Sequence, residues 1–281
     1  MKIKLFLGHG GYCVANARHV VKNDPKSKIK FHALFGLIHH QDKGWILFDT
    51  AYTKRFYEAT KSYPNRIYAN LTKVFVNDDD TVVSQLKNFG IAPEEISHVI
   101  ISHFHADHIG GLKDFNNAQF YCSERAYSDL KKTRKWLGFS KGILHDLIPS
   151  NFDERVVLIE DCSSKNEDKI FGHKFDLFKD RSIYIYELPG HAAGQIGILI
   201  ETEKKSYFLI ADSCWDQRAY KEHKLPNKIV KLFFDSWKDY VNSIDKITQF
   251  HKANPQTSIV PTHCFATTKK LVSTNFDMDV L

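Results

Sequence analysis

One short segment of the sequence is dense in side chains that bind metal ions. Residues 102–111 read Ser-His-Phe-His-Ala-Asp-His-Ile-Gly-Gly, with potential ligands at His103, His105, Asp107 and His108. Imidazole and carboxylate groups suit divalent zinc, whereas purely structural zinc sites usually contain several cysteines. From composition, the pattern H-x-H-x-D-H would arise by chance in roughly 0.3% of such chains. The segment therefore predicts a divalent-metal site, most naturally for zinc.

The strand expected just before this segment explains how its side chains could converge. Ser97–Ser102 contains three consecutive apolar β-branched residues, which is typical of a buried strand. In an extended chain, alternate side chains point to one side, so the first two histidines and the aspartate can meet. His108 directly follows Asp107, so in an extended chain it would point to the opposite side. We expect the backbone to turn there, with the freedom that Gly110 and Gly111 provide.

Three further potential ligands share one setting, because each follows an apolar run and stands beside small or turn-forming residues. They are His191 after Leu188-Pro189-Gly190, Asp212 after Leu209-Ile210-Ala211, and His263 after Ile259-Val260-Pro261-Thr262. Each alone is more often a buried structural histidine or a helix-capping aspartate. Together with the first segment they give the order H-x-H-x-D-H, then His, Asp and His.

This order resembles the ligand set of the metallo-β-lactamase superfamily, and the resemblance extends from about Ile29 to His263. It implies a four-layer αβ/βα sandwich that holds two divalent metal ions per chain, most naturally Zn²⁺. The resemblance assigns one ion to His103, His105 and His191, the other to Asp107, His108 and His263, and a bridging role to Asp212. Asp49, in Phe48-Asp49-Thr50-Ala51, matches an early aspartate that supports the site without being a ligand.

The expected chemistry is metal-assisted hydrolysis. A bound divalent ion lowers the pKa of water from 15.7 toward about 7, so a metal-bridging hydroxide could attack an ester carbonyl. Asp107 is expected to be catalytic, as the proton carrier. Within the superfamily, residues 35–50 and 119–127 resemble the N-acyl homoserine lactone lactonases. We therefore expect a binuclear hydrolase that opens a lactone or cleaves a small ester.

One position departs from the lactonase pattern. Those lactonases carry a tyrosine three residues after the bridging aspartate, and this sequence has Trp215 there. An indole N–H donates one hydrogen bond but cannot act as an acid or an acceptor. Trp215 is therefore either a substrate contact with a reduced donor role, or a packing residue in a site for another substrate.

The expected elements form an α/β fold in one domain, residues 1–281, with two sheets covered by helices. We expect helices at Asp80–Asn88, Glu124–Leu137 and Trp237–His251, and strands at Lys2–Leu7, Ile29–His40, Trp45–Asp49, Ser97–Ser102, Gln119–Cys122, Val156–Ile159, Ser182–Leu188, Ile196–Glu201, Ser206–Ala211 and Thr257–Val260.

An insertion at roughly residues 123–180 is expected to cap the metal cleft, because loops that border a site often set its specificity. Its apolar side chains either line an acyl-chain site or only anchor the insertion; they are Trp136, Leu137, Phe139, Ile143 and Leu144. His145 is a candidate substrate contact. His9 and His223 are further candidates near the site.

Charge and cysteine usage limit the partners and the compartment. The 39 Lys and Arg against 33 Asp and Glu give a net charge of +6, and the basic residues are scattered. The densest group, within residues 131–135, is interpreted as a solvated helix face, so no nucleic-acid partner is expected. Five cysteines without a C-x-x-C pair, and no apolar run of signal or membrane length, favour a cytoplasmic protein without a membrane partner.

The same ligands leave other functions open. A thioester hydrolase would normally add a C-terminal helical domain, and a phosphodiesterase would need a phosphate-binding surface. A catalytically silent metal-binding module is a further alternative. The ligand set accepts zinc, manganese or iron, and the sequence leaves the oligomeric state open.

Overall fold

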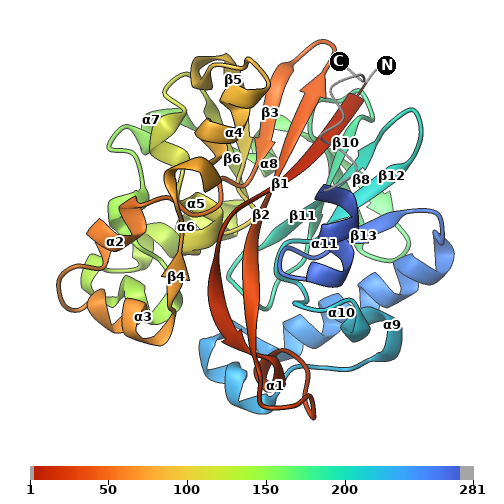
Figure 1. Ribbon diagram of the computed structural model, residues 1–281. Helices are drawn as coiled ribbons and strands as arrows, with labels where there is room; N and C mark the ends of the chain where they lie inside the picture. Colours follow the sequence, from red (N-terminus) through yellow and green to blue (C-terminus); the bar gives the residue numbers. More distant parts are fainter. Residues whose placement is uncertain (1–2, 273–281) are drawn as a thin grey trace.

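The computed structural model describes residues 3–272, which form two β-sheets packed face to face (Figure 1). The seven-stranded sheet has the order β4-β1-β2-β3-β5-β6-β7, and the six-stranded sheet has the order β13-β12-β11-β10-β9-β8. The strands are β1 (Ile3–Asn16), β2 (Lys28–His40), β3 (Gly44–Phe48), β4 (Val74–Phe75), β5 (Ile96–Ile100), β6 (Gln119–Cys122), β7 (Val156–Leu158), β8 (Ser164–Asp168), β9 (Gly172–Asp176), β10 (Ile183–Glu187), β11 (Ile196–Glu201), β12 (Ser206–Leu209) and β13 (Ser258–Val260).

Helices cover both outer faces of this pair of sheets (Figure 1). The α-helices are α1 (Ala17–Val20), α2 (Arg55–Ala59), α3 (Arg66–Leu71), α4 (Val82–Asn88), α5 (Ala106–Ile109), α6 (Glu124–Lys132), α7 (Phe152–Arg155), α8 (Ile159–Cys162), α9 (Arg218–Glu222), α10 (Trp237–Ala253) and α11 (Phe265–Val272). The 3₁₀ turns are η1 (Asp78–Asp80), η2 (Pro93–Glu95), η3 (Leu112–Asp114), η4 (Lys135–Lys141), η5 (His145–Leu147) and η6 (Lys228–Phe233).

Three hydrophobic clusters fill the three interfaces between these layers. Alternation along β10 shows the principle: Ile183 and Ile185 point into the cluster between the sheets, whereas Tyr186 packs with the helices outside. On the other sheet, Ile100 faces the second sheet while its neighbour Val99 faces the outer helices. Because strand side chains alternate, each strand contributes to two interfaces. The expected four-layer αβ/βα architecture is confirmed.

The structure also differs from the expected elements. Strand β1 continues to Asn16 because it pairs with β2 along almost its whole length, and β4, β8 and β9 were not expected. The basic helix ends at Lys132 instead of Leu137, because the buried Thr133 takes an extended backbone. The chain then forms η4.

The range expected as an insertion contains more than a cap. Residues 123–180 supply α6, η4 and η5, but also β7 of the first sheet and β8 and β9 of the second. That the whole chain is one domain stays a prediction. Within residues 3–272, no helix has the length and apolar character needed to cross a bilayer.

Candidate metal centre

The two sheets bring the predicted ligands to one edge of the sandwich. Asp49 follows β3, and the segment that begins at His103 follows β5, which runs parallel to β3. His191 follows β10, Asp212 follows β12, and His263 follows β13. Strands β12 and β13 are parallel, and β10 is antiparallel to β11, which is antiparallel to β12. All five strands therefore end on the same side.

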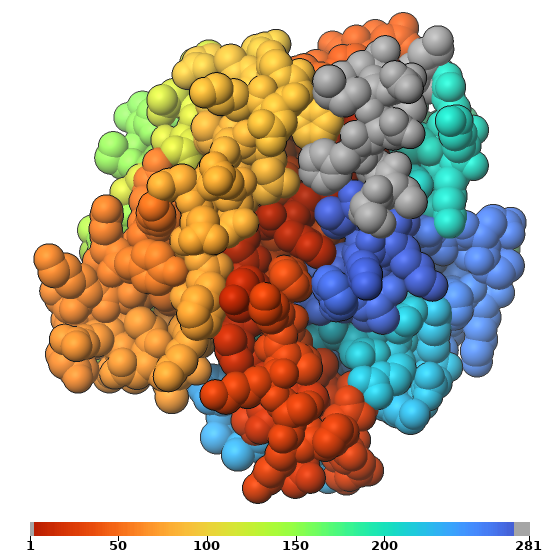
Figure 2. Space-filling view, viewed as in Figure 1, coloured from red at the N-terminus to blue at the C-terminus, as the bar shows by residue number. Residues whose placement is uncertain are grey.

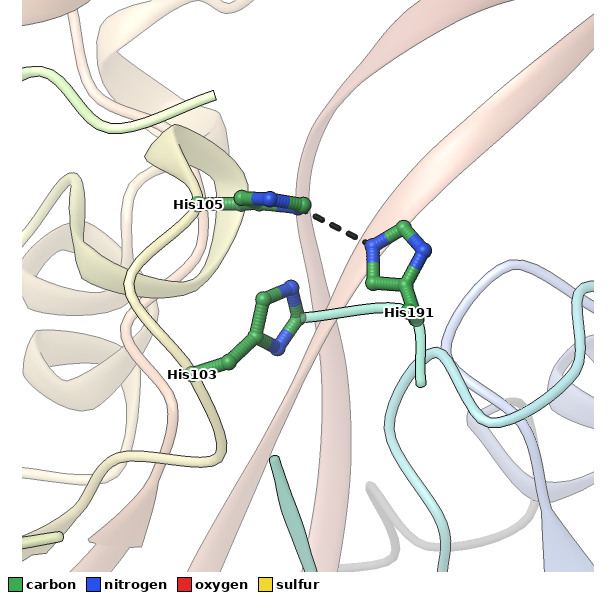
Figure 3. A group of neighbouring side chains, drawn as sticks. All are labelled: His103, His105 and His191. Carbon is green, nitrogen blue, oxygen red and sulfur yellow. Dashed lines mark hydrogen bonds between the residues drawn. The ribbon is translucent and has the colours of Figure 1, made fainter. Parts of the chain in front are cut away.

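The first group of side chains consists of His103, His105 and His191. Their nitrogen atoms lie within 4.8 Å of one another, and Nδ1 of His105 is 3.0 Å from Nε2 of His191. Figure 3 shows the three rings around a common space, with His191 reaching it from a separate segment of the chain. This group can hold one metal ion.

The second group consists of Asp107, His108 and His263, which also place their ligand atoms within 4.8 Å of one another. Oδ2 of Asp107 is 3.5 Å from Nε2 of His108 and 3.3 Å from Nε2 of His263. All three side chains are buried. This group can hold a second ion.

Asp212 lies between the two groups. Its Oδ2 is 3.4 Å from Nε2 of His191 and 3.0 Å from Nε2 of His263, and its Oδ1 is 3.3 Å from Nε2 of His108. The contact between Oδ1 of Asp212 and Nε2 of His108 is an ion-pair distance and not a hydrogen bond, so both of these buried atoms, like Nε2 of His103, lack a hydrogen-bond partner. Buried polar atoms are normally satisfied, so these atoms fit a centre completed by cations.

Hydrogen bonds on the far side of the rings fix their orientation. Nδ1 of His108 lies 2.7 Å from Oδ2 of Asp49, which also accepts a hydrogen bond from the Ser102 hydroxyl. Oδ1 of Asp49 accepts from the Ser102 backbone N–H. Asp49 itself has a φ of 59°, a left-handed conformation that aspartate tolerates better than most residues. The early aspartate therefore orients His108 from behind.

Four residues that hold the histidines were not predicted. Nδ1 of His263 is 2.9 Å from the carbonyl oxygen of His32, and the Phe31 ring stacks on the His263 ring at 4.5 Å. Nδ1 of His103 is 3.0 Å from the Ser102 hydroxyl, and the Lys141 backbone hydrogen-bonds His105. Except for Ser102, these residues are far from the ligands in sequence, so spacing carries no signal for them.

The segment 102–111 converges in a different way from the one expected. The chain turns into α5 at Ala106, so Asp107 and His108 both lie on a helical turn and not on an extended continuation. Gly110 and Gly111 have ordinary negative φ values. A Cβ at Gly110 would lie 2.5 Å from the Ala51 carbonyl oxygen. These glycines therefore allow close packing against the loop after β3, and the prediction that they provide turning freedom was wrong.

The electrostatic environment differs between the two groups. Burial, followed by neighbouring histidines, lowers the pKa of His103 well below its usual range, and burial lowers the pKa of His191 to about 3. Burial also opposes the charged form of His263, but Asp212 and Asp107 outweigh it and raise the pKa to about 10. The pKa of His108 is likewise raised well above its usual range, because Asp107, Asp49 and Asp212 outweigh the effect of burial.

Trp215 contacts the centre through both its N–H and its ring. Its Nε1 donates a hydrogen bond to Oδ2 of Asp212 at 3.0 Å. Its ring packs edge-on against Phe31, His191 and Phe234, at centroid distances of 5.7, 5.7 and 5.2 Å. The ring therefore packs, as one of the two alternatives expected, and its N–H donates to the carboxylate of Asp212. That Trp215 contacts the substrate stays a prediction.

The other candidate histidines lie apart from the two groups. His145 faces a different cavity, and its Nε2 is 3.4 Å from the Leu130 carbonyl oxygen. His223 is exposed and lies 3.6 Å from Asp245. His9 stacks on His32, and burial together with His32 and His263 lowers its pKa to about 3. His9 is thus close enough to the predicted ligand His263 for the two to interact electrostatically.

A cavity of about 230 Å³ opens beside the first group. His105 and His191 line it together with apolar side chains, among them Phe104, Ile143 and Phe234. Of the apolar residues expected in the insertion, only Ile143 lines this cavity; Leu144 is buried in the core, and Trp136 and Leu137 are exposed.

Comparisons with known proteins agree with this fold. The model of the metallo-beta-lactamase superfamily matches residues 31–204. The N-acyl homoserine lactonase AttM of Azorhizobium caulinodans is 27% identical over 173 residues, 61% of this chain and 60% of that protein. An N-acyl homoserine lactonase of a Bacillus species is 24% identical over 161 residues, 57% of this chain and 54% of that protein. The alignments thus span only about three fifths of these relatives.

Solved structures show the same fold over nearly the whole chain. An N-acyl homoserine lactone hydrolase with N-hexanoyl-L-homoserine at its catalytic metal centre has a TM-score of 0.75 and 19% identity, and the match covers 96% of this chain and 97% of that one. AidC, a dizinc quorum-quenching lactonase, has a TM-score of 0.64 and 15% identity, with 93% and 87% coverage.

The chain belongs to the metallo-β-lactamase superfamily. Its curated relatives and structural neighbours include N-acyl homoserine lactone lactonases, and its histidine and aspartate cluster is able to hold metal ions.

Proposed function

We propose that this chain is a binuclear metal-dependent hydrolase that opens a lactone or cleaves a small carboxylic ester. The observation that carries the proposal is the convergence of seven buried or partly buried ligand side chains around buried atoms that lack hydrogen-bond partners. The names of the relatives supply the substrate class, because they refer to N-acyl homoserine lactones.

In this proposal the first group holds one ion, the second group holds the other, and Asp212 contacts both. Asp49 orients His108, and Zn²⁺ is the ion expected in both positions. When bound, two such ions supply a water that ionises near neutral pH and a Lewis acid that polarises the ester carbonyl.

Asp107 is proposed as the proton carrier. Its Oδ2 lies 3.5 Å from Nε2 of His108 and 3.3 Å from Nε2 of His263, and the charge of a cation bound there would keep this carboxylate ionised at neutral pH. Hydrolysis adds water across the acyl C–O bond, giving a carboxylic acid and an alcohol. Asp107 accepts a proton from the water and returns it to the leaving oxygen.

The cavity beside the first group is the proposed site for the apolar part of the substrate. Phe104, Ile143 and Phe234 supply an apolar wall. Among the residues that line the cavity, Lys141 pairs with Asp129, and Asp235 pairs with Arg125. Because these charges are already paired, the interior of the cavity, in contrast to the protein surface around its mouth, favours a neutral ester over a phosphodiester.

The test is a substrate panel on metal-loaded protein, with lactones, p-nitrophenyl esters, thioesters, β-lactams and phosphodiesters. We expect turnover of lactones or simple esters, close to two metal ions per chain by elemental analysis, and loss of activity on chelation. Faster turnover of a thioester or a phosphodiester would replace the proposed substrate class. Activity in folded, metal-free protein would contradict the metal-dependent mechanism itself.

A further inference from the structure

Three segments near the candidate metal centre share a distinctive composition. Residues 60–73, 130–144 and 223–234 contain eleven lysines and arginines and no aspartate or glutamate. The whole chain contains 33 acidic residues, so their absence from these segments separates them from the rest of the surface. We call the three segments together the basic rim.

The basic rim also exposes large apolar side chains. The exposed fractions are 83% for Leu232, 70% for Tyr63, 69% for Leu71, 56% for Trp136 and 55% for Ile229. Side chains of this kind are normally buried, and a group of them at the surface marks an interaction site.

The turn η6 shows how these side chains are presented. Ile229, Leu232 and Phe233 are exposed, while Val230 and Phe234 pack into the core behind them. The geometry of the turn therefore directs Ile229, Leu232 and Phe233 outward, in the same turn as Lys228 and Lys231. Val230 and Phe234 fill the core beneath.

The segments of the basic rim adjoin one another around the cavity. Helix α3 packs beside η4. Ser140 and Lys141 of η4 and Leu232 and Phe233 of η6 line the cavity that reaches His105 and His191. The rim therefore borders the mouth of the candidate substrate site.

Some charges of the rim are already paired. Lys131, Lys141 and Lys224 contact Asp153, Asp129 and Glu222, which lie outside the three segments. With these three carboxylates counted against eleven cations, the rim remains strongly positive.

We propose that the basic rim docks on an anionic bilayer surface, with the lysines and arginines at the headgroups and the apolar side chains in the interfacial layer. The positive charge complements anionic headgroups, and the apolar side chains select a bilayer over a nucleic acid, which offers no apolar layer at its surface. Docking would hold the cavity mouth at the interface, where amphiphilic molecules concentrate. The proposal goes beyond the proposed hydrolysis and does not depend on it. It replaces the expectation from the sequence that the protein has no membrane partner and that residues 131–135 are only a solvated helix face.

The experiment measures co-sedimentation of the full-length, metal-loaded chain with phosphatidylcholine vesicles, with and without about 30% phosphatidylglycerol. We expect at least about tenfold tighter binding to the anionic vesicles, because each basic residue near the surface adds attraction. Binding should weaken as salt shortens the Debye length to about 3 Å near 1 M.

Variants identify the surface that binds. The double variant Trp136→Ser/Ile229→Ser changes two side chains outside the cavity lining, and we expect about tenfold weaker vesicle binding with an unchanged melting temperature. Two controls lie outside the rim: Phe265→Ser on α11, and Lys204→Glu/Lys205→Glu in the turn between β11 and β12. Both should bind vesicles like the wild type.

Three results would overturn the proposal. Equal sedimentation with and without phosphatidylglycerol would exclude recognition of anionic lipid. Wild-type binding by the double variant would place the binding surface elsewhere. A dimer in sedimentation velocity that is lost in the double variant, without any vesicle binding, would show that a second copy of the chain covers the rim.

Discussion

The two ligand groups of the candidate metal centre differ in their residue types and in the direction in which the pKa values of their histidines are shifted. The first group contains only imidazoles, and burial lowers the pKa of all three, so they are neutral at pH 7. The second group pairs a carboxylate with two histidines whose pKa values are raised. In the first group burial, together with repulsion from neighbouring histidines, keeps the ligands neutral, whereas in the second group a positive charge must balance the buried carboxylates.

The residues that surround the two groups also differ in charge. Main-chain contacts and ring packing support both groups: Lys141 and Phe234 lie against the first group, and the His32 carbonyl and the Phe31 ring lie against His263 of the second. The second group differs because a carboxylate, Asp49, is also hydrogen-bonded to its His108. We therefore expect changes to Asp107 and Asp49 to act mainly on the second group.

Asp107→Asn should have the largest effect. The amide cannot carry the proton, and removing general acid–base catalysis typically lowers kcat about 10²- to 10⁴-fold. Steady-state kinetics with the best substrate of the panel measures the loss, and elemental analysis of the same preparation counts the ions. We expect the ion of the first group to remain. A variant with normal metal content and at least half of the wild-type kcat would remove Asp107 from the mechanism.

The sequence predicted much of this centre because the ligands follow apolar strands. A buried strand that ends in His or Asp is visible as a run of β-branched residues, and parallel strands bring their ends to one edge. The spacing could not show the helical turn that begins at Ala106, because Asp107 and His108, the last two ligands of the segment, fit either an extended or a helical backbone. The close approach of Gly110 to the Ala51 carbonyl oxygen, which accompanies the helical turn, depends on tertiary packing that the spacing does not show.

The residues that the sequence did not reveal act across long separations. His32 and Phe31 lie near the start of β2, yet they hold His263 after β13. Their side chains also fit a strand core, so nothing local distinguishes them. The helix expected at Glu124–Leu137 failed for a related reason, since the tertiary position of Thr133 overrides helix propensity.

Asp49→Asn should weaken metal binding at the second group. The amide lacks the charge that orients His108 and stabilises it as a hydrogen-bond donor, and such outer contacts typically change metal affinity about 10- to 100-fold. Competition with a chromogenic chelator measures the two affinities. Asp180→Asn is a matched control, because Asp180 is 3.0 Å from the buried His40 away from the centre. If Asp49→Asn lowered the affinity for both ions equally, the two groups would not be separate.

Trp215→Phe should lower the affinity for both ions by a similar factor of about tenfold, the lower end of the range typical for such outer contacts. Phenylalanine keeps an aromatic ring between Phe31 and Phe234 but loses the N–H that donates to Asp212. Because Asp212 contacts both groups, its orientation affects both. Trp237→Phe is the control, since that ring stacks on Phe234 without contacting Asp212. If Trp215→Phe changes only KM and leaves both affinities intact, Trp215 acts on the substrate instead.

Phe31→Leu should give the smallest effect and the sharpest distinction between the groups. The Phe31 ring lies parallel to the His263 ring, and losing such an aromatic contact costs about 0.5–1.5 kcal/mol. Urea unfolding of the metal-free chain should show this loss, and Phe234→Leu should show a similar one because Phe234 packs on His191.

The two variants should then differ in the metal affinities measured by chelator competition. Phe31→Leu should weaken the ion of the second group, whose His263 has lost its stacking partner, and Phe234→Leu the ion of the first. If each variant weakened both ions equally, the rings would be supporting one undivided centre, and the contrast between the groups would lie in charge alone.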